Sequence, residues 1–282
     1  MTKQTSILKA PFPWFGGKRT IADDVWKRLG NPKQYIEPFC GSAAMLWAAP
    51  KRSSLEVICD QNFYVANFWR CLKFQAQAVY RWQDYPVSHV DLAARHRWLT
   101  DMKRTASLQQ QLSDAEWPGD AQVAGWWVWG QCCWIGSGWC ESQIPHVSDA
   151  GRGVEKWFLR LAKGLERCRV IHGDWSRCLN HHYGGKNTAI FFDPPYKGFE
   201  RLYHGGSNAP LVANAVAEWC KANEYSARIA LCGHAGDYDL PGWQVLEWSR
   251  GRLTYGGSNT TADECVWFSP ECIDPEQDLF SL

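Results

Sequence analysis

The chain has 282 residues with a formal net charge of +1, and 45% of the residues are hydrophobic. This length allows one large α/β domain with a substantial core, and no uninterrupted apolar segment is long enough to cross a membrane. No signal peptide or amphipathic basic leader is visible, so we expect a cytoplasmic protein without a membrane partner. Residues 263–282 carry six acidic and no basic side chains, which leaves a basic body of +7 and an acidic tail.

Twelve cysteines are scattered along the chain without a C-x-x-C pair. Cys132, Cys133, Cys140 and His146 lie close together in the sequence, but their spacing fits no common zinc pattern. A disulfide framework is unusual in the cytoplasm. We therefore expect buried free thiols and no metal site.

A glycine-rich segment lies near the start of the chain. Pro11–Arg19 reads PFPWFGGKR and precedes a helical pattern over Thr20–Leu29. It is not a Walker phosphate loop, because Phe12 takes the place of the first glycine and Arg19 replaces the magnesium-binding Ser or Thr. A nucleoside triphosphatase is therefore rejected. The glycines instead let the backbone approach a ligand closely, with Lys18 available to a carboxylate.

The next residues predict the first half of a Rossmann-like unit. A strand over Gln34–Phe39 leads into a glycine turn and a helix over about 43–49. The following strand, Leu55–Asp60, ends in an acid about twenty residues beyond Gly41, the offset at which a carboxylate meets ribose hydroxyls. With a single glycine in the turn, the pattern indicates a ribose-bearing cofactor but no particular dinucleotide.

The alternation of strands and helices stops after Phe63, where helical patterns with polar interruptions begin. Six of the eighteen tryptophans lie between Trp117 and Trp139. Because so many rings are too apolar for solvent, we favour a core of this subdomain over direct stacking on bases. Trp139, which follows a glycine, is the best candidate for a ring that reaches a base.

Five basic residues recur at spacings of four, four, three and four, so they share one face of a predicted helix. They are Arg152, Lys156, Arg160, Lys163 and Arg167. A charged stripe is usually a solvated face. Beside a site that modifies bases, contact with DNA phosphates is an equal alternative, because phosphate neutralisation supplies most non-specific affinity.

The apolar run Thr188–Phe192 predicts a buried parallel strand that ends in Asp193-Pro194-Pro195-Tyr196. The prolines stop ladder pairing and deliver this tetrad to the carboxyl edge of the sheet, where ligands bind. Asp193 and the Pro194 carbonyl are two acceptors for a nucleobase amine, whose lone pair must localise before it attacks an electrophilic carbon. The Tyr196 ring offers a face on which a flipped base stacks. A purely structural strand-to-loop turn is the alternative.

The remaining residues complete the predicted sheet. Residues 197–208 are rich in glycine and polar side chains, which predicts a mobile loop over the substrate. A helix is expected over Ala209–Ala222, and strands over Ala227–Cys232, Trp243–Trp248 and Glu264–Phe268.

Five motifs in order carry a family resemblance. They are Pro-Trp-Phe-Gly-Gly-Lys (13 to 18), Glu-Pro-Phe-Cys-Gly-Ser-Ala (37 to 43), Asp60 with Asn62, Gly-Asp-Trp (173 to 175) and Asp-Pro-Pro-Tyr (193 to 196). This series resembles the Dam-like (D12 class) DNA adenine N6-methyltransferases. The resemblance implies a Rossmann-like α/β sheet that uses S-adenosyl-L-methionine. It also implies a catalytic domain of residues 1–64 and 170–270, a mainly helical target-recognition insertion of 65–169, and an acidic tail of 271–282.

The resemblance assigns the methionine end of the cofactor to two residues of the first motif. Trp14 and Lys18 would lie near that end, and Phe39 and Gly41 would lie in the turn beneath it. The family thus implies a cofactor held by both N-terminal motifs.

The nucleoside end of the cofactor is assigned in the same way. Asp60 would hold the ribose, and Asp174, followed by Trp175, would hold the adenine amino group. Cys40 and Ser42 depart from the small residues that are common in the family, and Trp175 stands where Phe is usual. These departures affect the shape of the pocket. A turn residue is the alternative for Asp174.

The resemblance predicts an enzyme of DNA modification, such as a restriction-modification methyltransferase, that flips adenine out of double-stranded DNA and acts as a monomer. A cytosine N4-methyltransferase needs similar acceptors, but Asp in place of Ser at position 193 favours adenine. RNA is a further alternative substrate. A DNA-binding protein that keeps the fold without turnover is a different class, and the intact acceptors and cofactor acids argue against it.

The acidic tail ends in Gln277-Asp278-Leu279-Phe280-Ser281-Leu282, which resembles the short peptides that dock on bacterial sliding clamps. Leu279 and Phe280 would be the apolar anchors. Glu276 stands where the usual pattern has its glutamine, so a frayed terminus is the alternative.

Overall fold

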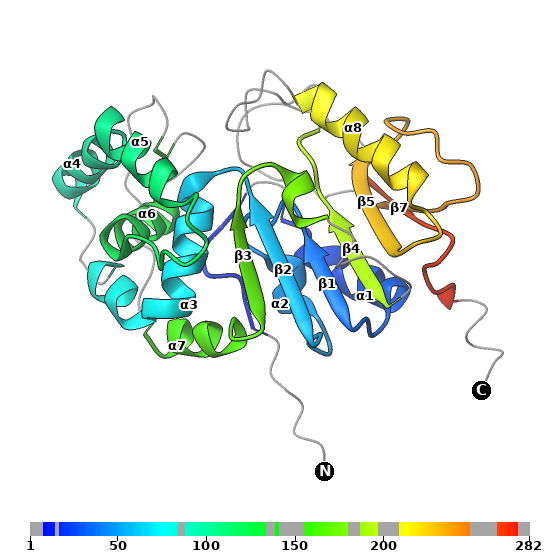
Figure 1. Cartoon of the computed structure of the whole chain (residues 1–282), viewed down its shortest axis with the longest axis horizontal. Coiled ribbons are helices and arrows are strands. Elements are labelled where there is room, and N and C mark those ends of the chain that lie inside the picture. Colours follow the sequence, from blue (N-terminus) through cyan, green and yellow to red (C-terminus); the bar gives the residue numbers. More distant parts are fainter. Residues whose placement is uncertain are drawn as a thin grey trace, which may run out of the picture.

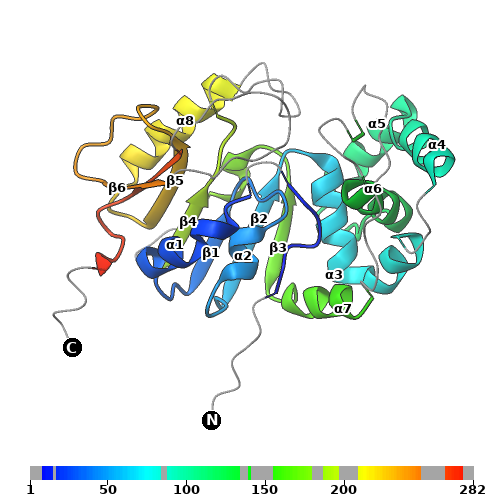
Figure 2. The same cartoon turned by 180° about the vertical axis from the view of Figure 1, so that it is seen from behind.

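A seven-stranded sheet forms the centre of the computed structural model (Figures 1 and 2). The structure describes residues 8–14, 17–83, 88–133, 139–140, 155–179, 187–196, 209–248 and 264–275. The strand order is β3-β2-β1-β4-β5-β7-β6, with β1 Gln34–Glu37, β2 Leu55–Asp60, β3 Cys168–His172, β4 Thr188–Phe192, β5 Arg228–His234, β6 Gln244–Trp248 and β7 Glu264–Phe268. β1 to β5 are parallel, whereas β7 runs antiparallel to both of its neighbours. The predicted Rossmann-like α/β sheet is confirmed.

Both faces of the sheet are covered, which explains the absence of polar alternation in β4. Ala189 and Phe191 face a core that includes α1 (Ala22–Leu29) and α2 (Ala44–Ala48). Ile190 and Phe192 face a second core that includes α8 (209–222). A strand buried on both faces reads as a continuous apolar run.

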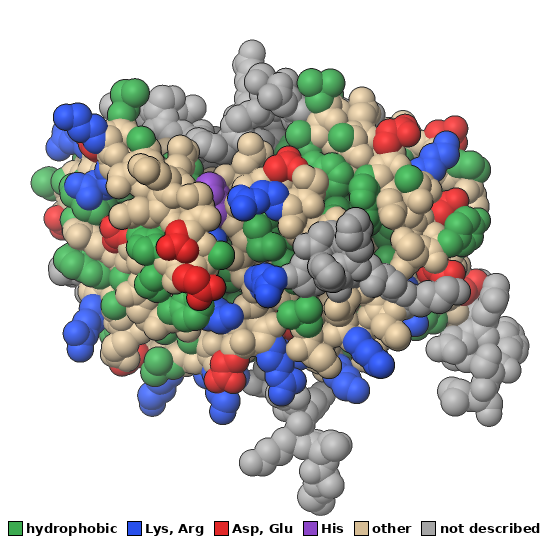
Figure 3. Space-filling model, viewed as in Figure 1, with side chains coloured by type: hydrophobic (Ala, Val, Ile, Leu, Met, Phe, Trp, Pro, Cys, Tyr) green, Lys and Arg blue, Asp and Glu red, His purple; other side chains and the backbone are tan. Residues whose placement is uncertain are grey.

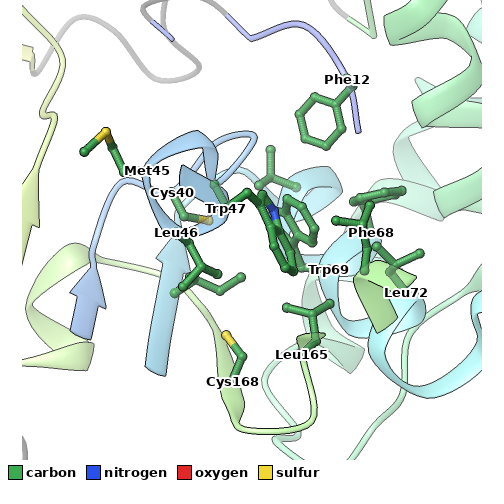
Figure 4. Packing of buried hydrophobic residues seen from close by; sticks show 14 of the residues in the cluster. Phe12, Cys40, Met45, Leu46, Trp47, Phe68, Trp69, Leu72, Leu165 and Cys168 are labelled. Atoms are coloured by element: carbon green, nitrogen blue, oxygen red, sulfur yellow. The ribbon is translucent and has the colours of Figure 1, made fainter. Parts of the chain in front are cut away.

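Among the described residues, five helices follow β2 and lie beside the β3 edge of the sheet (Figure 1). They are α3 Phe63–Gln83, α4 His89–Leu99, α5 Met102–Gln111, α6 Ala121–Cys133 and α7 Glu155–Gly164. α3 packs against α6, α7 and β3, so these helices share a core with the sheet. Figure 4 shows this continuity, with Trp69 of α3 among Trp47, Leu165 and Cys168. The predicted insertion 65–169 therefore has no separate core among the described residues, and its boundaries stay a prediction.

The tryptophan-rich segment forms part of this core. Trp127 and Trp129 are each 1% exposed. Trp139, predicted as the ring that reaches a base, is itself only 6% exposed, and its Nε1 donates to the Trp127 carbonyl over 2.9 Å. The ring lies against Gly130, where a Cβ would approach it to 1.9 Å. The ring therefore belongs to the core in this structure, and its contact with a base stays a prediction.

The predicted and the observed bounds of the elements differ most at the basic helix. α8 and β7 have the predicted bounds, whereas α7 ends at Gly164 and Arg167 lies in the turn before β3. The helical bonding ends with the Leu165 N–H, and a turn follows in which the Cys168 N–H donates to the Leu165 carbonyl over 2.9 Å as the chain enters β3. Arg152, the expected loop 197–208 and the end of the tail, including Leu279 and Phe280, lie outside the described residues.

The twelve cysteines all lie in the described part of the chain, where none forms a disulfide and ten are buried. Burial raises the pKa of thiols such as Cys40 and Cys71, which keeps them protonated and unreactive. No helix among the described residues combines the length and apolarity that a membrane span requires.

Candidate active site

The carboxyl ends of three neighbouring strands bring acidic residues to one edge of the sheet. Glu37 ends β1, Asp60 ends β2, and Asp193 follows the last residue of β4. The strands are adjacent and parallel, with Glu37 in register with Ile58 of β2. This edge is where open α/β sheets bind ligands.

Asp193 is held by a buried lysine from the N-terminal segment. Lys18 Nζ lies 2.9 Å from Asp193 Oδ1 and 3.0 Å from Oδ2, although the two residues are 175 positions apart. The Lys18 side chain is 2% exposed and that of Asp193 is 20% exposed. Burial alone would lower the pKa of Lys18, but Asp193, Cys232 and Glu264 outweigh it and raise this pKa. A protonated Lys18 therefore orients both oxygens of Asp193.

The contacts of Lys18 bear on its predicted position at the methionine end of a cofactor. Its ammonium is already engaged by Asp193 and lies 3.5 Å from Glu264 Oε2. The prediction that Lys18 serves a carboxylate agrees with this geometry, and the carboxylates are protein side chains. The geometry gives no support to a direct contact between Lys18 and a cofactor.

Tyr196 lies beside Lys18 and is 5% exposed. Lys18 Nζ lies 4.9 Å from the centre of its ring, and the His234 ring meets it edge-on at 4.7 Å. A base that stacks on Tyr196 therefore requires these neighbours, or other residues that cover the ring, to move.

A tight turn beneath the site depends on Gly41. This residue has φ +45°, and a Cβ there would approach the Trp14 indole to 2.3 Å, so both backbone and packing require glycine. Its carbonyl accepts from Trp69 Nε1 over 2.8 Å. The turn thus brings Trp14 and the backbone after Phe39 against the end of β2.

Asp60 fixes this turn through two backbone hydrogen bonds of 2.8 Å. The Gly41 N–H donates to Oδ2 and the Asn62 N–H donates to Oδ1. Burial raises the pKa of Asp60 to about 6, and the two N–H donors limit the rise. The Cys40 thiol lies a further 4.0 Å from Oδ2, so Oδ1 is the oxygen with a lone pair left for a hydroxyl donor among these contacts.

Comparison with known proteins supports the predicted family. Residues 14–89 match the sequence model described as D12 class N6 adenine-specific DNA methyltransferase. Two Vibrio cholerae serotype O1 proteins, from the classical Ogawa and El Tor Inaba strains and both named DNA adenine methylase, are each 31% identical over 78 residues. The match covers 28% of this chain and 26% of each relative. Residues 14–89 are thus similar to the Dam-like, D12-class family.

The chain thus spans about a quarter of the length of the curated relatives it matches. The matched range contains Trp14, Lys18, Gly41 and Asp60 but ends long before Asp193. The structure joins the two parts, because Lys18 from the D12-class segment bonds to Asp193 from outside it.

The other predicted cofactor residues lie around the same edge of the sheet. Asp174 follows β3 and caps the short helix η2 (Trp175–Cys178), with its carboxylate accepting from the Ser176 N–H over 3.0 Å. Trp175 packs edge-on against Phe192 at 6.1 Å. The cap is the turn role expected as the alternative for Asp174, and its cofactor role stays a prediction.

Glu37 is a site residue that sequence reasoning missed. It is 3% exposed, and its Oε2 accepts from the Tyr35 hydroxyl and the Leu46 N–H, each over 3.2 Å. Burial raises the pKa of Glu37 to about 8, with smaller contributions from Asp193 and Asp60. An acid at the end of an apolar strand was the available signal. Glu264 was missed as well, because nothing near it in the sequence marks it as a partner of Lys18.

The described residues of the predicted basic stripe lie toward the amino ends of the strands, whereas the acidic cluster lies at the carboxyl ends. Lys156, Arg160, Lys163 and Arg167 are exposed, but β3 begins directly after Arg167, which places that residue at the amino edge. α7 lies at the bottom of Figure 1, and Figure 3 shows Lys and Arg side chains gathered along this lower margin. The topology thus separates the described basic residues from the acidic cluster, and their contact with DNA phosphates stays a prediction.

Proposed function

We propose that the chain transfers a methyl group from S-adenosyl-L-methionine to the N6 amino group of adenine in double-stranded DNA. The observation that carries the proposal is the carboxylate of Asp193, held by buried Lys18 at the carboxyl edge of the sheet. The D12-class match of residues 14–89 supports the same reaction.

The acceptors of this edge suit an exocyclic amine. The N6 lone pair is delocalised into the adenine ring and must localise as the nitrogen becomes tetrahedral and positive. Asp193 and the Pro194 carbonyl would accept from the two N–H groups, and these bonds strengthen as the charge develops. Since N6 of a stacked adenine lies inside the duplex, the target base must be flipped, with Tyr196 as the proposed platform.

The residues present fit the predicted cofactor. When bound, S-adenosyl-L-methionine supplies an electrophilic methyl group on a sulfonium. Asp60, whose carboxylate lies at the carboxyl end of β2, would hold the ribose hydroxyls, and Asp174 and Trp175 would lie at the nucleobase. Trp14 would lie near the methionine end, and the turn with Phe39 and Gly41 would lie beneath it.

Separate incubations of tritiated cofactor with unmethylated DNA and with RNA, each followed by nucleoside chromatography, test the proposal. We expect label in N6-methyl-2′-deoxyadenosine. Label in N4-methyl-2′-deoxycytidine would indicate the cytosine alternative, label in the RNA sample alone would exclude DNA as the substrate, and DNA binding without label would identify a silent binding protein. The monomeric state, the cytoplasmic location and the clamp contact of Leu279 and Phe280 stay predictions.

Asp60→Ala should weaken cofactor affinity by roughly ten- to a hundredfold, the value of a charge-assisted contact of about 1.5 to 3 kcal/mol. Calorimetry measures the affinity, and the melting temperature reports separately on the loosened turn at Gly41. Asp60→Asn keeps one acceptor and should retain more affinity. Unchanged affinity in Asp60→Ala would remove this residue from the cofactor site.

Lys163→Ala tests whether the exposed face of α7 holds phosphates. If Lys163 neutralises one DNA phosphate, its removal should make the slope of log affinity against log salt smaller by about 1. Lys221→Ala in α8 is the matched control, because it removes one exposed lysine from another face. Equal salt slopes for the two variants would show that α7 is a solvated face.

A further inference from the structure

The strand topology brings a second carboxylate, that of Glu264, beside Asp193 at the carboxyl edge of the sheet. β7 runs antiparallel to β5, so β7 begins where β5 ends. Its first residue, Glu264, is in register with His234, the last residue of β5. Glu264 is 8% exposed, and His234 contacts the Tyr196 ring. Reversal of this one strand therefore delivers a buried carboxylate to the Asp193 cluster.

Lys18 lies between the two carboxylates. Its Nζ is 2.9 Å from Asp193 and 3.5 Å from Glu264, with side-chain exposures of 2%, 20% and 10% for Lys18, Asp193 and Glu264. Charges at these distances interact strongly because burial limits screening by water and salt. The shorter distance and the contact with both oxygens make Asp193 the primary partner, and Glu264 faces the remaining side of the ammonium.

We propose that Glu264 is a positioning residue, which shares Lys18 with Asp193 and so preserves the strength of Asp193 as an acceptor for the amine. This inference rests on the proposed function. An isolated pair of Lys18 and Asp193 would be neutral, and the ammonium would draw charge from the oxygens that face the substrate. Two carboxylates around one ammonium leave a net charge of −1. That charge favours the positive nitrogen of the transition state over the neutral amine of the ground state.

The alternative is a purely structural role, in which Glu264 only satisfies a buried ammonium. A structural role affects stability in every variant. A role exercised through Lys18 affects turnover and disappears when the ammonium is removed. The two roles therefore differ in a double-mutant cycle.

The test compares Glu264→Gln in the parent and in Lys18→Met. Glu247→Gln is the matched control, since Glu247 is an exposed acid on the neighbouring strand β6. We expect Glu264→Gln to lower the single-turnover methylation rate roughly tenfold, with cofactor and DNA affinities within about twofold, and to have no further effect in Lys18→Met. Melting temperatures identify any variant that fails to fold.

A second readout does not depend on activity. The pKa of Lys18 can be followed by NMR of labelled lysine, with the resonance assigned by its absence in Lys18→Arg. Glu264→Gln should lower this pKa by about one unit or more, because it removes an opposite charge within about 4 Å of the ammonium, and Glu247→Gln should not.

Each outcome decides a separate point. A parental rate in Glu264→Gln, or an equal loss of rate in the Lys18→Met background, would overturn the positioning role. An unchanged Lys18 pKa would overturn the coupling even if the protein proved inactive. If the parent transfers no methyl group but Glu264→Gln still lowers the Lys18 pKa, the proposed function is rejected and the positioning role of Glu264 with it. The electrostatic coupling between Glu264 and Lys18 would then still be supported.

Discussion

Asp193→Ala is expected to slow single-turnover methyl transfer by at least about a hundredfold while cofactor affinity stays within a few-fold. The carboxylate accepts from N6 more strongly as the nitrogen becomes positive, so its loss acts on the transition state. The fold should survive the change, because Lys18 keeps Glu264 as a partner 3.5 Å away and does not become an isolated buried charge. Rates from rapid quench and affinities from calorimetry measure the two effects.

Two further variants serve as controls for Asp193. Asp193→Asn keeps the shape but can present a donor where an acceptor is needed, so it should also be impaired. Tyr196→Phe keeps the ring and should retain much of the activity, since stacking does not need the hydroxyl. A near-normal rate for Asp193→Ala would refute the mechanism even if the protein methylates DNA.

Glu37→Gln is expected to reduce the fall in the free energy of unfolding that accompanies a rise in pH from about 5 to about 8. In the unfolded chain Glu37 releases its proton near its ordinary pKa of 4.5, whereas burial in the folded protein raises that pKa to about 8. The unfolded state therefore binds fewer protons in this window, and the free energy of unfolding falls as pH rises, by up to about 1.4 kcal/mol per pH unit. Summed over the window, the loss is on the order of 4 kcal/mol.

Glutamine has no proton to lose, and its carbonyl can still accept from the Tyr35 hydroxyl and the Leu46 N–H. Urea unfolding at pH 6.5, 7.25 and 8 measures the slope above the pKa of Asp60, which burial raises to about 6. The exposed Glu247→Gln is the control and should keep the parental slope. Parallel stability curves for Glu37→Gln and the parent would show that Glu37 is ionised in the folded protein at neutral pH.

The sequence by itself determined the elements whose signals are local. An apolar run closed by two prolines predicted β4 and the Asp193 tetrad at its end, and α8 and β7 have the predicted bounds. Strand, glycine turn and acid likewise predicted the unit from β1 to Asp60. Such signals need only neighbouring residues, because periodicity and the backbone limits of proline and glycine act within a few positions.

Only the tertiary structure decided which of these residues meet and in what environment. Glu264 reaches Lys18 and Asp193 because β7 is antiparallel within an otherwise parallel set, and strand order leaves no local pattern in the sequence. Burial, which raises the pKa of Glu37 and covers Trp139, is a property of the packed chain. The basic residues of α7 share a face as their spacing predicted, but the side of the sheet on which that face lies follows from where β3 begins. Charge, exposure and partnership depend on distances through space, which residues far apart in the sequence acquire only when the core forms.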